Sequence, residues 1–450
     1  MGDLFGTDGI RGVANRHPMT PEMALAIGRA TVHVCRTRKA EQPRIVIGHD
    51  TRISSEMLEG ALVAGIDSMG GNAFLAGTLP TPGIAFLARS MEMTAGIVIS
   101  ASHNPYEDNG IKLFSGSGFK LPDSREEEIE RLVTNPENLG LMPTGSHIGS
   151  VSRITDASER YSAFCKATFP EGLDLEGMKI VLDCANGASY RTAPLIFESL
   201  GANVTAIHCN PNGTNINDSC GSQHTQSLSE KVRELHAHAG LAFDGDGDRL
   251  IAVDESGREI NGDQIMAICC KTYKDRGWLK NNRIVLTVMS NFGFRMLLES
   301  MGVDCEIAPV GDRYVMEMMQ SSGAILGGEA SGHIIFMNHH TSGDGIISAL
   351  QLLATMRFTD QPLSQLSQIL QLYPQKIINV KVSSKPPLDS ISMLQTAVQA
   401  AESELGRQGR ALIRYSGTQS LCRVMVEAPT EESANRLALS LADVVRQCVG

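Results

Sequence analysis

The sequence predicts an α/β fold: three related α/β domains with mixed, parallel-rich sheets, followed by a small α+β domain at the C-terminal end. The main observation is a pattern that occurs three times. A basic residue opens a branched apolar strand, a helix follows and ends at glycine, and a second strand comes next. The strand openings are RIVIG at 44–48, KIVLD at 179–183 and RIVLT at 283–287. Each unit predicts parallel strands with helices on both faces of the sheet.

The helices of these three units are expected to end at Gly70, Gly201 and Gly302. Glycine is favoured just past the end of a helix because it adopts positive φ without a steric clash. A segment rich in Gly, Pro and Ser at 135–150 predicts a connection that leads into the second domain.

The tail predicts the fourth domain. Alternating apolar residues at 411–414 and 422–427 read as strands, and an apolar-striped helix begins at Glu431. Together these boundaries predict domains at residues 1–153, 154–254, 255–371 and 372–450.

Composition excludes several classes of protein. A chain of 450 residues with 42% hydrophobic content is ordinary for a globular protein of several domains, and its net charge of −11 argues against nucleic-acid binding. No apolar run approaches the roughly 20 residues of a membrane helix, and no secretory leader opens the sequence. The ten cysteines contain no CxxC pair, which favours free thiols. We expect a cytoplasmic protein without membrane or nucleic-acid partners.

Small polar residues follow the apolar run 97–99, which reads as a buried strand. Ligands of open α/β sheets bind at the carboxyl ends of strands, so this place is a candidate site. Ser102 is a candidate nucleophile or carrier of a covalent phosphate. His103 is beside it, and Lys112 is on the next apolar run. A plain polar turn is the alternative.

Three carboxylates alternate with glycine between two apolar strands: Asp244, Asp246 and Asp248. This spacing can surround one hard cation, and a ligand set of oxygen alone favours Mg²⁺. A calcium loop is disfavoured, because Arg249 stands at the sixth position, where that loop requires glycine, and because strands flank the motif. An acidic turn without an ion is the remaining alternative.

A glycine-rich segment follows an expected strand at 324–326 and presents Glu329, Ser331 and His333. A carboxylate, a hydroxyl and an imidazole offered together suit the hydroxyl groups of a sugar. The alternative is that His333 is structural.

Near the C-terminal end, arginine and hydroxyl side chains surround a glycine. The residues are Arg414, Ser416, Gly417 and Thr418, with Arg423 shortly after them. Such a group forms a cradle for an anion. It lacks the lysine and the spacing of a nucleotide-binding loop, so a phosphate monoester is the expected ligand. Such turns are common, and the motif is weak by itself.

Five segments in this order resemble the loops of the α-D-phosphohexomutase family: FGTDGIRG, SASHNPYEDNGIK, DGDGDR, GGEASGH and RYSGT. Taken alone, the first of them, which carries Arg11, is equally a plain turn. Five loops spread over nearly the whole chain make the resemblance specific. Family members have four domains around a central cleft, and the first three are related to one another.

Within the family, the chain is most similar to the bacterial phosphoglucosamine mutases. The similarity is carried by VGDRYV at 310–315 and by residues 339–353 and 423–427. Two departures concern specificity: Ala330 stands where that branch usually has Gln, and Tyr415 where it usually has Pro. A phosphomannomutase/phosphoglucomutase of neutral hexose phosphates is the alternative within the family. A metal-dependent phosphatase and a non-catalytic sugar-phosphate sensor are the alternatives outside it.

The resemblance implies a reaction. Ser102 carries a phosphoryl group and, with the three aspartates, binds one Mg²⁺ per chain. Glucosamine 6-phosphate and glucosamine 1-phosphate interconvert through a hexosamine 1,6-bisphosphate, which also acts as activator. The product leads to UDP-N-acetylglucosamine and the cell wall. A kinase or self-phosphorylation primes Ser102, and the protein is a monomer or a homodimer.

The resemblance also assigns the other site residues. The catalytic group adds His103, Lys112, Arg11 and Arg249 to Ser102. Lys112, His103 and His333 are the candidate general bases, in that order. The substrate-binding residues are Asp312, Arg313, Glu329, Ser331, His333, Arg414, Ser416, Gly417, Thr418 and Arg423.

Overall fold

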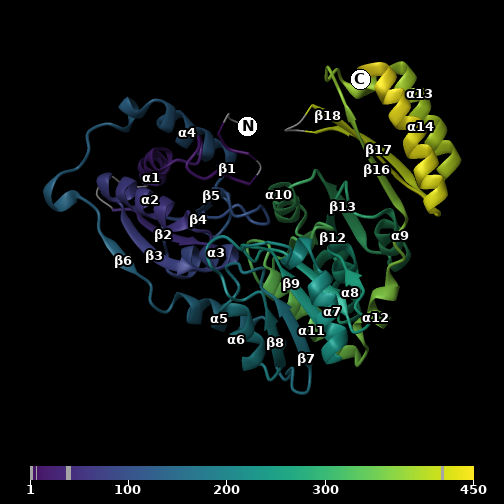
Figure 1. Ribbon diagram of the computed structural model, residues 1–450, viewed down its shortest axis with the longest axis horizontal. Coiled ribbons are helices and arrows are strands. Elements are labelled where there is room, and N and C mark those ends of the chain that lie inside the picture. The colour runs from purple at the N-terminus through teal and green to yellow at the C-terminus, as the bar shows by residue number, and fades with distance from the viewer. Residues whose placement is uncertain (1–3, 7, 37–41, 417–419) are drawn as a thin grey trace. The chain divides into compact units, whose positions relative to one another are not determined.

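The computed structural model describes residues 4–6, 8–36, 42–416 and 420–450. The chain divides into two compact units, Met1–Met289 with Asp304–Ile369, and Ser290–Val303 with Leu370–Gly450. Three mixed sheets belong to the first unit and a three-stranded sheet to the second (Figure 1). The α/β fold predicted from the sequence is confirmed. The division into four domains stays a prediction.

The first sheet has the strand order β1-β5-β4-β2-β3-β6. β2 runs parallel to β3 and β4, whereas β5 runs antiparallel to both β4 and β1. The strands are β1 (Ile10–Val13), β2 (Arg44–His49), β3 (Asn72–Thr78), β4 (Ala95–Ile99), β5 (Asp108–Ser115) and β6 (Val151–Arg153). The helices are α1 (Pro21–Cys35), α2 (Ser55–Ser68), α3 (Thr81–Ser90) and α4 (Asp123–Thr134).

Helices cover both faces of this sheet because side chains alternate along its strands. Ile45 and Ile47 join the hydrophobic core that includes residues of α1, α2 and α4. On the opposite face, Gly48 and Gly96 leave room for Ile84 of α3. A Cβ added at Gly48 would lie 2.3 Å from Ile84 Cδ1, so a larger residue there would force the Ile84 side chain to shift. The prediction of a sheet covered on both faces is confirmed here.

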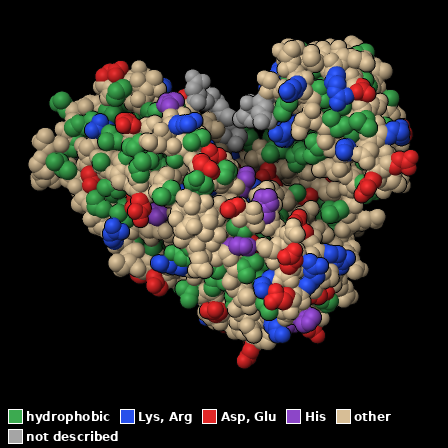
Figure 2. Space-filling model, viewed as in Figure 1, with side chains coloured by type: hydrophobic (Ala, Val, Ile, Leu, Met, Phe, Trp, Pro, Cys, Tyr) green, Lys and Arg blue, Asp and Glu red, His purple; other side chains and the backbone are tan. Residues whose placement is uncertain are grey.

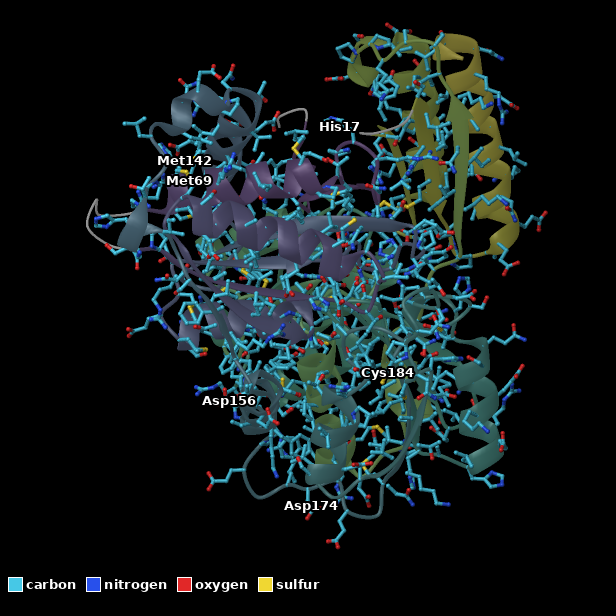
Figure 3. All side chains as sticks on the ribbon, turned by 60° about the vertical axis from the view of Figure 1, so that its left-hand side comes forward. His17, Met69, Met142, Asp156, Asp174 and Cys184 are labelled. Carbon is cyan, nitrogen blue, oxygen red and sulfur yellow. The ribbon has the colours of Figure 1, made fainter. Side chains whose placement is uncertain are left out.

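The second sheet has the order β11-β10-β9-β7-β8. β7 runs parallel to β8 and β9, and β10 runs antiparallel to β9 and β11. The strands are β7 (Lys179–Asp183), β8 (Asn203–Ile207), β9 (Ala239–Phe243), β10 (Leu250–Asp254) and β11 (Glu259–Ile260), and the helices are α5 (Ala157–Ala167), α6 (Thr192–Ser199) and α7 (Gln226–Leu235). Cys184 is buried just beyond β7, whereas Asp156 and Asp174 extend into solvent (Figure 3).

The third sheet has the order β13-β12-β14-β15, in which β12 runs parallel to β13 and β14. The strands are β12 (Arg283–Thr287), β13 (Asp304–Ala308), β14 (Leu326–Gly328) and β15 (Ile334–Phe336). The helices are α8 (Gly262–Asp275), α10 (Asp312–Ser322), α11 (Gly345–Thr359) and α12 (Leu363–Leu366). α11 is buried along most of its length, as expected of a helix that is apolar on all sides. The strand expected at 324–326 is instead β14, so Gly327 and Gly328 lie within a strand.

The second unit is a small α+β structure, as predicted. Its antiparallel sheet has the order β16-β18-β17. The strands are β16 (Gln375–Lys381), β17 (Arg410–Tyr415) and β18 (Leu421–Glu427), and the helices are α9 (Phe292–Met301), α13 (Ser392–Leu405) and α14 (Glu431–Val449). Val424 and Val426 pack in the same core as Leu437 and Leu441 of α14. Arg410 joins this sheet to the segment before α9, because its Nη2 donates to Ser290 O at 2.7 Å.

Short 3₁₀ turns complete the backbone: η1 (Pro136–Leu139), η2 (Gly145–His147), η3 (Gly221–Gln223), η4 (Lys280–Asn282), η5 (Ser367–Ile369) and η6 (Leu388–Ser390). All ten cysteines are free thiols. None of the described helices combines the length and hydrophobicity that a membrane span needs. On the face drawn in Figure 2, Lys and Arg side chains are interspersed with Asp and Glu.

Candidate active site

Ser102 lies just beyond β4, and its side chain is buried. Its φ of 53° is in the left-handed region, which residues other than glycine rarely adopt. Its Oγ donates to Asp244 Oδ2 at 2.5 Å and lies 3.3 Å from His103 Nδ1. The structure therefore brings together the predicted phosphoryl carrier, its neighbouring imidazole and the first carboxylate of the metal loop.

Two side chains that the sequence analysis missed hold the backbone of this loop. Arg52 Nη2 donates to Ser102 O at 2.9 Å and to Asn104 O at 2.8 Å. Asn217 Nδ2 reaches the same two oxygens, at 2.8 and 3.0 Å. Asp50 holds Arg52 Nε at 2.8 Å in turn. A strained conformation persists only where surrounding contacts fix it, and these contacts fix Ser102.

Removing the Asn217 amide should misplace Ser102 without unfolding the protein. We expect Asn217→Ala to lower kcat by about tenfold to 10²-fold with KM nearly unchanged, because small displacements of reacting groups have effects of this size. Asn215→Ala is the matched control, since the Asn215 amide donates to Asn210 O in the same loop. Equal kinetics of the two variants in a steady-state mutase assay would contradict a positioning role for Asn217.

The acidic triad (Asp244, Asp246 and Asp248) occupies the turn between β9 and β10 and is almost fully buried. One carboxylate oxygen of each residue lies within 4.8 Å of the other two. Asp246 Oδ1 and Asp248 Oδ1 are buried and accept no hydrogen bond from the described residues. Burial and the charges of Asp248 and Asp246 raise the pKa of Asp244 well above its usual range. Crowded carboxylates with unused oxygens fit a divalent cation, and oxygen ligands alone suit Mg²⁺.

Lys112 points into the triad from β5. Its Nζ lies 2.7 Å from Asp246 Oδ2, 3.7 Å from Asp248 Oδ2 and 3.0 Å from Asp8 Oδ2. Burial alone would lower the pKa of Lys112, but these carboxylates raise it above its usual range. Lys112 is therefore a fixed cation, and the structure does not favour its first place among the candidate general bases.

His103 has the opposite character. Burial and the charges of Arg249 and Arg11 lower the pKa of His103 to about 4, so the imidazole is neutral at pH 7. Arg249 itself lies beside the triad, with its Nε 4.0 Å from Asp244 Oδ2 and 3.9 Å from Asp248 Oδ1. A neutral imidazole near Ser102 can accept a proton, which a charged lysine cannot.

The glycine-rich segment at 327–333, here called the sugar-type loop, lies against the start of β10. Leu250 N donates to Gly332 O at 3.0 Å, and a Cβ at Gly332, whose φ is 92°, would lie 2.2 Å from Leu250 O. Glycine at 332 is thus what allows the two loops to touch. Glu329 Oε1 accepts from Gly311 N at 2.9 Å, and its Oε2 is 3.5 Å from Ser331 Oγ.

His333 connects the triad to α10. Its Nδ1 lies 3.5 Å from Asp248 Oδ2, and its Nε2 lies 3.7 Å from Asp312 Oδ2. Burial would lower the pKa of His333, but Asp248 and Asp312 raise it to about 9. Asp312 is also 2.5 Å from Lys120 Nζ, and Lys120 contacts Asp8. Asp8 and Lys120 are further members of this network that the sequence analysis missed.

Models of the phosphoglucomutase/phosphomannomutase family match almost the whole chain. Its α/β/α domains I, II and III match residues 2–139, 159–257 and 261–373, and its C-terminal domain matches residues 377–444. The chain belongs to this family, the α-D-phosphohexomutases. The resemblance inferred from the five loops is confirmed.

Relatives named phosphoglucosamine mutase resemble this phosphohexomutase over its full length. One from Syntrophobacter fumaroxidans is 56% identical over 450 residues, and one from Syntrophus aciditrophicus is 53% identical; both alignments cover 100% of each chain. A solved structure of a phosphoglucomutase/phosphomannomutase family protein from Burkholderia thailandensis is 22% identical, with a TM-score of 0.80 over 98% of this chain and 97% of that one. The protein is thus an enzyme of the isomerase class, as predicted.

Arg313 follows Asp312 at the start of α10 and lines the same pocket as Asp312 and His333. Its Nη2 donates to Glu126 Oε2 at 2.8 Å and to Leu121 O at 3.4 Å, and its guanidinium also pairs with Asp123. Two carboxylates of α4 thus hold it. These contacts join α10 to α4, and the role of Arg313 in substrate binding stays a prediction.

The expected anion cradle around Arg414 and Ser416, here called the phosphate-type loop, begins at the end of β17 in the second unit. Arg414 is the direct cross-strand neighbour of Arg423 on β18. Burial and the charge of Arg423 lower the pKa of Arg414, and Arg423 Nε is buried without a hydrogen-bond partner among the described residues. Two adjacent guanidinium groups favour an anion between them. Gly417 and Thr418 lie outside the described residues.

Proposed function

We propose that this phosphohexomutase interconverts glucosamine 6-phosphate and glucosamine 1-phosphate. The observation that carries the chemistry is the buried Ser102 hydroxyl, which lies 2.5 Å from Asp244 of the acidic triad and 3.3 Å from His103 Nδ1. Lys112 and Arg249 lie beside the carboxylates of the triad. Identity above one half with full-length relatives named phosphoglucosamine mutase supports the choice of substrate. A mutase of neutral hexose phosphates is the second candidate, because Ala330 departs from the usual branch pattern.

Ser102 is the proposed phosphoryl carrier. In the first half-reaction, the bond between phosphorus and Ser102 Oγ breaks, and O1 of glucosamine 6-phosphate bonds to the phosphorus. The proton of the O1 hydroxyl passes to a base, and Ser102 recovers a proton. The product is the hexosamine 1,6-bisphosphate. After this intermediate has turned, the Ser102 hydroxyl loses its proton to a base, and its Oγ bonds to the phosphorus of the 6-phosphate. The bond between that phosphorus and O6 breaks, O6 gains a proton, and glucosamine 1-phosphate remains.

The acidic triad and the oxygen on Ser102 would hold one Mg²⁺. When bound, the ion would offset negative charge on the transferring phosphoryl group. Lys112 and Arg249 add fixed positive charge beside the acidic triad. This charge would stabilise a transition state in which negative charge is spread over the phosphoryl oxygens. His103, 3.3 Å from Ser102 Oγ, is the proposed proton acceptor.

Arg414, Ser416 and Arg423 would bind the phosphate that does not react, together with Gly417 and Thr418. Arg414→Lys keeps the charge but loses the planar fork that binds two phosphate oxygens at once. We expect a higher KM and also a lower kcat, because remote binding energy positions the reacting end. The measurement is steady-state kinetics with Mg²⁺ titration. Unchanged kinetics combined with weaker Mg²⁺ binding would contradict this role.

Glu329 is the proposed partner of the substrate ammonium group. Asp312 is less suitable, because Lys120 lies 2.5 Å from its carboxylate and His333 also faces it. Glu329→Gln keeps the acceptor for Gly311 N and removes the charge. We expect the ratio of kcat/KM for glucosamine 6-phosphate over glucose 6-phosphate to fall by about tenfold or more, since one polar contact shifts preference by about 1–3 kcal/mol.

Asp312→Asn is the matched control for this substrate test, and its ratio should stay near that of the wild type. A larger shift in Asp312→Asn than in Glu329→Gln would reverse the assignment. Equal or better use of glucose or mannose phosphate by the wild type, primed with bisphosphate, would move the protein to the neutral-hexose branch. The route to UDP-N-acetylglucosamine and the cell wall, the cytoplasmic location, the priming of Ser102 and the monomer or homodimer stay predictions.

A further inference from the structure

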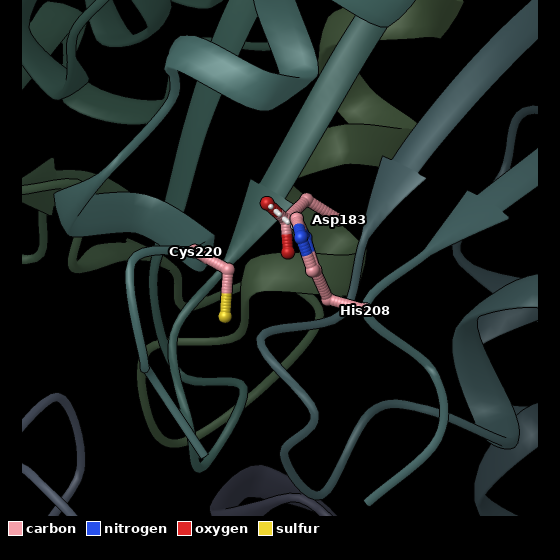
Figure 4. Close-up of side chains that lie close together, drawn as sticks. All are labelled: Asp183, His208 and Cys220. Atoms are coloured by element: carbon pink, nitrogen blue, oxygen red, sulfur yellow. Dashed lines mark ion pairs between the residues drawn. The ribbon is translucent and has the colours of Figure 1, made fainter. Parts of the chain in front are cut away.

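A second cluster of ligand-type side chains lies at the carboxyl ends of β7 and β8 (Figure 4). β7 ends at Asp183, which is in register with Ile207 at the end of β8, so His208 follows directly beside it. Asp183 Oδ2 accepts from Gly221 N at 2.9 Å, and this bond brings Cys220 to the same place. One ligand atom of each side chain lies within 4.8 Å of the other two.

We propose that Asp183, His208 and Cys220 form a second metal site, which takes a borderline cation of the Zn²⁺ class. The donor set is one carboxylate oxygen, one imidazole nitrogen and one sulfur. This set suits Zn²⁺ and not Mg²⁺, whose preferred ligands are oxygen alone. The acidic triad offers carboxylate oxygens alone, so the two sites would select different ions.

The distances fit a tetrahedral ion with modest adjustment. His208 Nδ1 forms an ion pair with Asp183 Oδ2 at 3.0 Å, so a cation can take the place of the proton between them. Ligand atoms around tetrahedral Zn²⁺ are about 3.5 Å apart, and the three ligand atoms here lie within 4.8 Å of one another. The fourth position would hold water.

Burial and access also fit. Asp183 is fully buried and Cys220 is 1% exposed, whereas the His208 side chain is 29% exposed and borders solvent. A metal ion can therefore enter past His208 and meet the other two ligands inside. Asp183 already accepts from Ala185 N and Gly221 N at 2.9 Å each, which fixes its orientation as outer-shell hydrogen bonds do at metal sites. Binding would replace the Cys220 thiol proton, which is released to solvent.

The cluster lies next to the loops that hold Ser102. Asn217 N donates to Ala185 O at 2.9 Å, and the Asn217 amide reaches Ser102 O. Ala188 N also donates to Gly245 O of the metal loop at 2.8 Å. An ion on Asp183, His208 and Cys220 would tie together the ends of the segments that carry these contacts.

Co²⁺ is the probe, because a cobalt–thiolate bond gives a charge-transfer absorption that oxygen ligands do not give. The titration uses full-length Asp246→Asn protein in excess Mg²⁺, so that the acidic triad does not compete. We expect one equivalent of Co²⁺ to give this absorption with the intensity of tetrahedral coordination, and Zn²⁺ to displace it. An absent thiolate band, or one that requires several equivalents, overturns the proposal.

Variants identify the cysteine that gives the cobalt–thiolate absorption band. Cys220→Ser should abolish it. His208→Gln, which keeps an amide donor beside the buried Asp183 carboxylate, should weaken Co²⁺ binding by at least the roughly tenfold loss seen at outer-shell positions of metal sites. Cys305→Ser is the matched control: a half-buried thiol in β13 whose loss should change nothing. A band that survives Cys220→Ser, or that Cys305→Ser removes, places the ion elsewhere and overturns the assignment. Asp183 is not a test position, since its carboxylate also holds two loops.

Discussion

Ser102→Ala will lose mutase turnover on the order of 10⁴-fold or more, the range found when the nucleophile of a covalent catalyst is removed. The substitution deletes the only atom in the proposal that can carry the phosphoryl group between the two ends of the sugar. It removes one hydroxyl from a buried position and keeps the backbone contacts of Arg52 and Asn217. The fold should therefore survive, and circular dichroism should match the wild type.

Intact mass and peptide mapping complete this test. Wild type incubated with a hexose bisphosphate should gain one phosphate on Ser102, and Ser102→Ala should gain none. Ser100→Ala is the control: Ser100 Oγ accepts from Ser102 N at 2.9 Å and donates to Asp50 at 2.5 Å, so it positions the loop but carries no phosphate. We expect it to be slower and still phosphorylated on Ser102. Full activity of Ser102→Ala, or a phosphate on Ser100, would contradict the role of Ser102 as phosphoryl carrier.

Features formed by residues that are close in sequence could be predicted from the sequence. The three strand–helix–strand units were visible because branched strands, helices and terminal glycines follow one another within about 30 residues, which is the span of one such unit. The acidic triad was visible for the same reason, since Asp244, Asp246 and Asp248 are near in sequence and their crowding is costly without a cation. In each unit the two predicted strands pair in parallel: β2 with β3, β7 with β8, and β12 with β13.

Contacts between distant segments could not be predicted in this way. Arg52 is 50 residues from Ser102 and Asn217 is 115 residues from it, and neither stands in a motif with a recognisable spacing. The pairing of Lys120 with Asp8 and Asp312 likewise joins three separate segments. The Asp and Arg just after β2, at the strand end where ligands bind, were the one available signal for Arg52.

The chemical character of Lys112 and of Arg313 depends on partners that lie far away in the sequence. Lys112 was placed first among the candidate general bases, but three carboxylates around its ammonium group favour the protonated form. Arg313 follows Asp312 in a branch-specific segment, yet Glu126 and Asp123 hold its guanidinium. A sequence shows the residue type and leaves these partners open.

Asp246→Asn will lower both Mg²⁺ affinity and turnover, the latter by about 10²–10³-fold, the size found when one preorganised charge-stabilising group is removed. Asp246 Oδ2 accepts from Thr81 Oγ1 at 2.6 Å and from Lys112 Nζ at 2.7 Å, while its buried Oδ1 has no hydrogen bond from the described residues. Asparagine can keep one acceptor for these donors, but its amide group then takes the place of the oxygen that a cation would use.

The fold should tolerate this change, because two effects oppose each other. Lys112 loses its nearest anionic partner but keeps Asp8 at 3.0 Å, and the repulsion that raises the pKa of Asp244 is reduced. Mg²⁺ titration by calorimetry, thermal unfolding and turnover at saturating Mg²⁺ separate these effects. Asp254→Asn at the far end of β10 is the matched control, since Asp254 holds Ser256 and Arg258 in a turn. It should alter stability alone. If Asp246→Asn keeps wild-type turnover and Mg²⁺ dependence, the acidic triad is not the metal site.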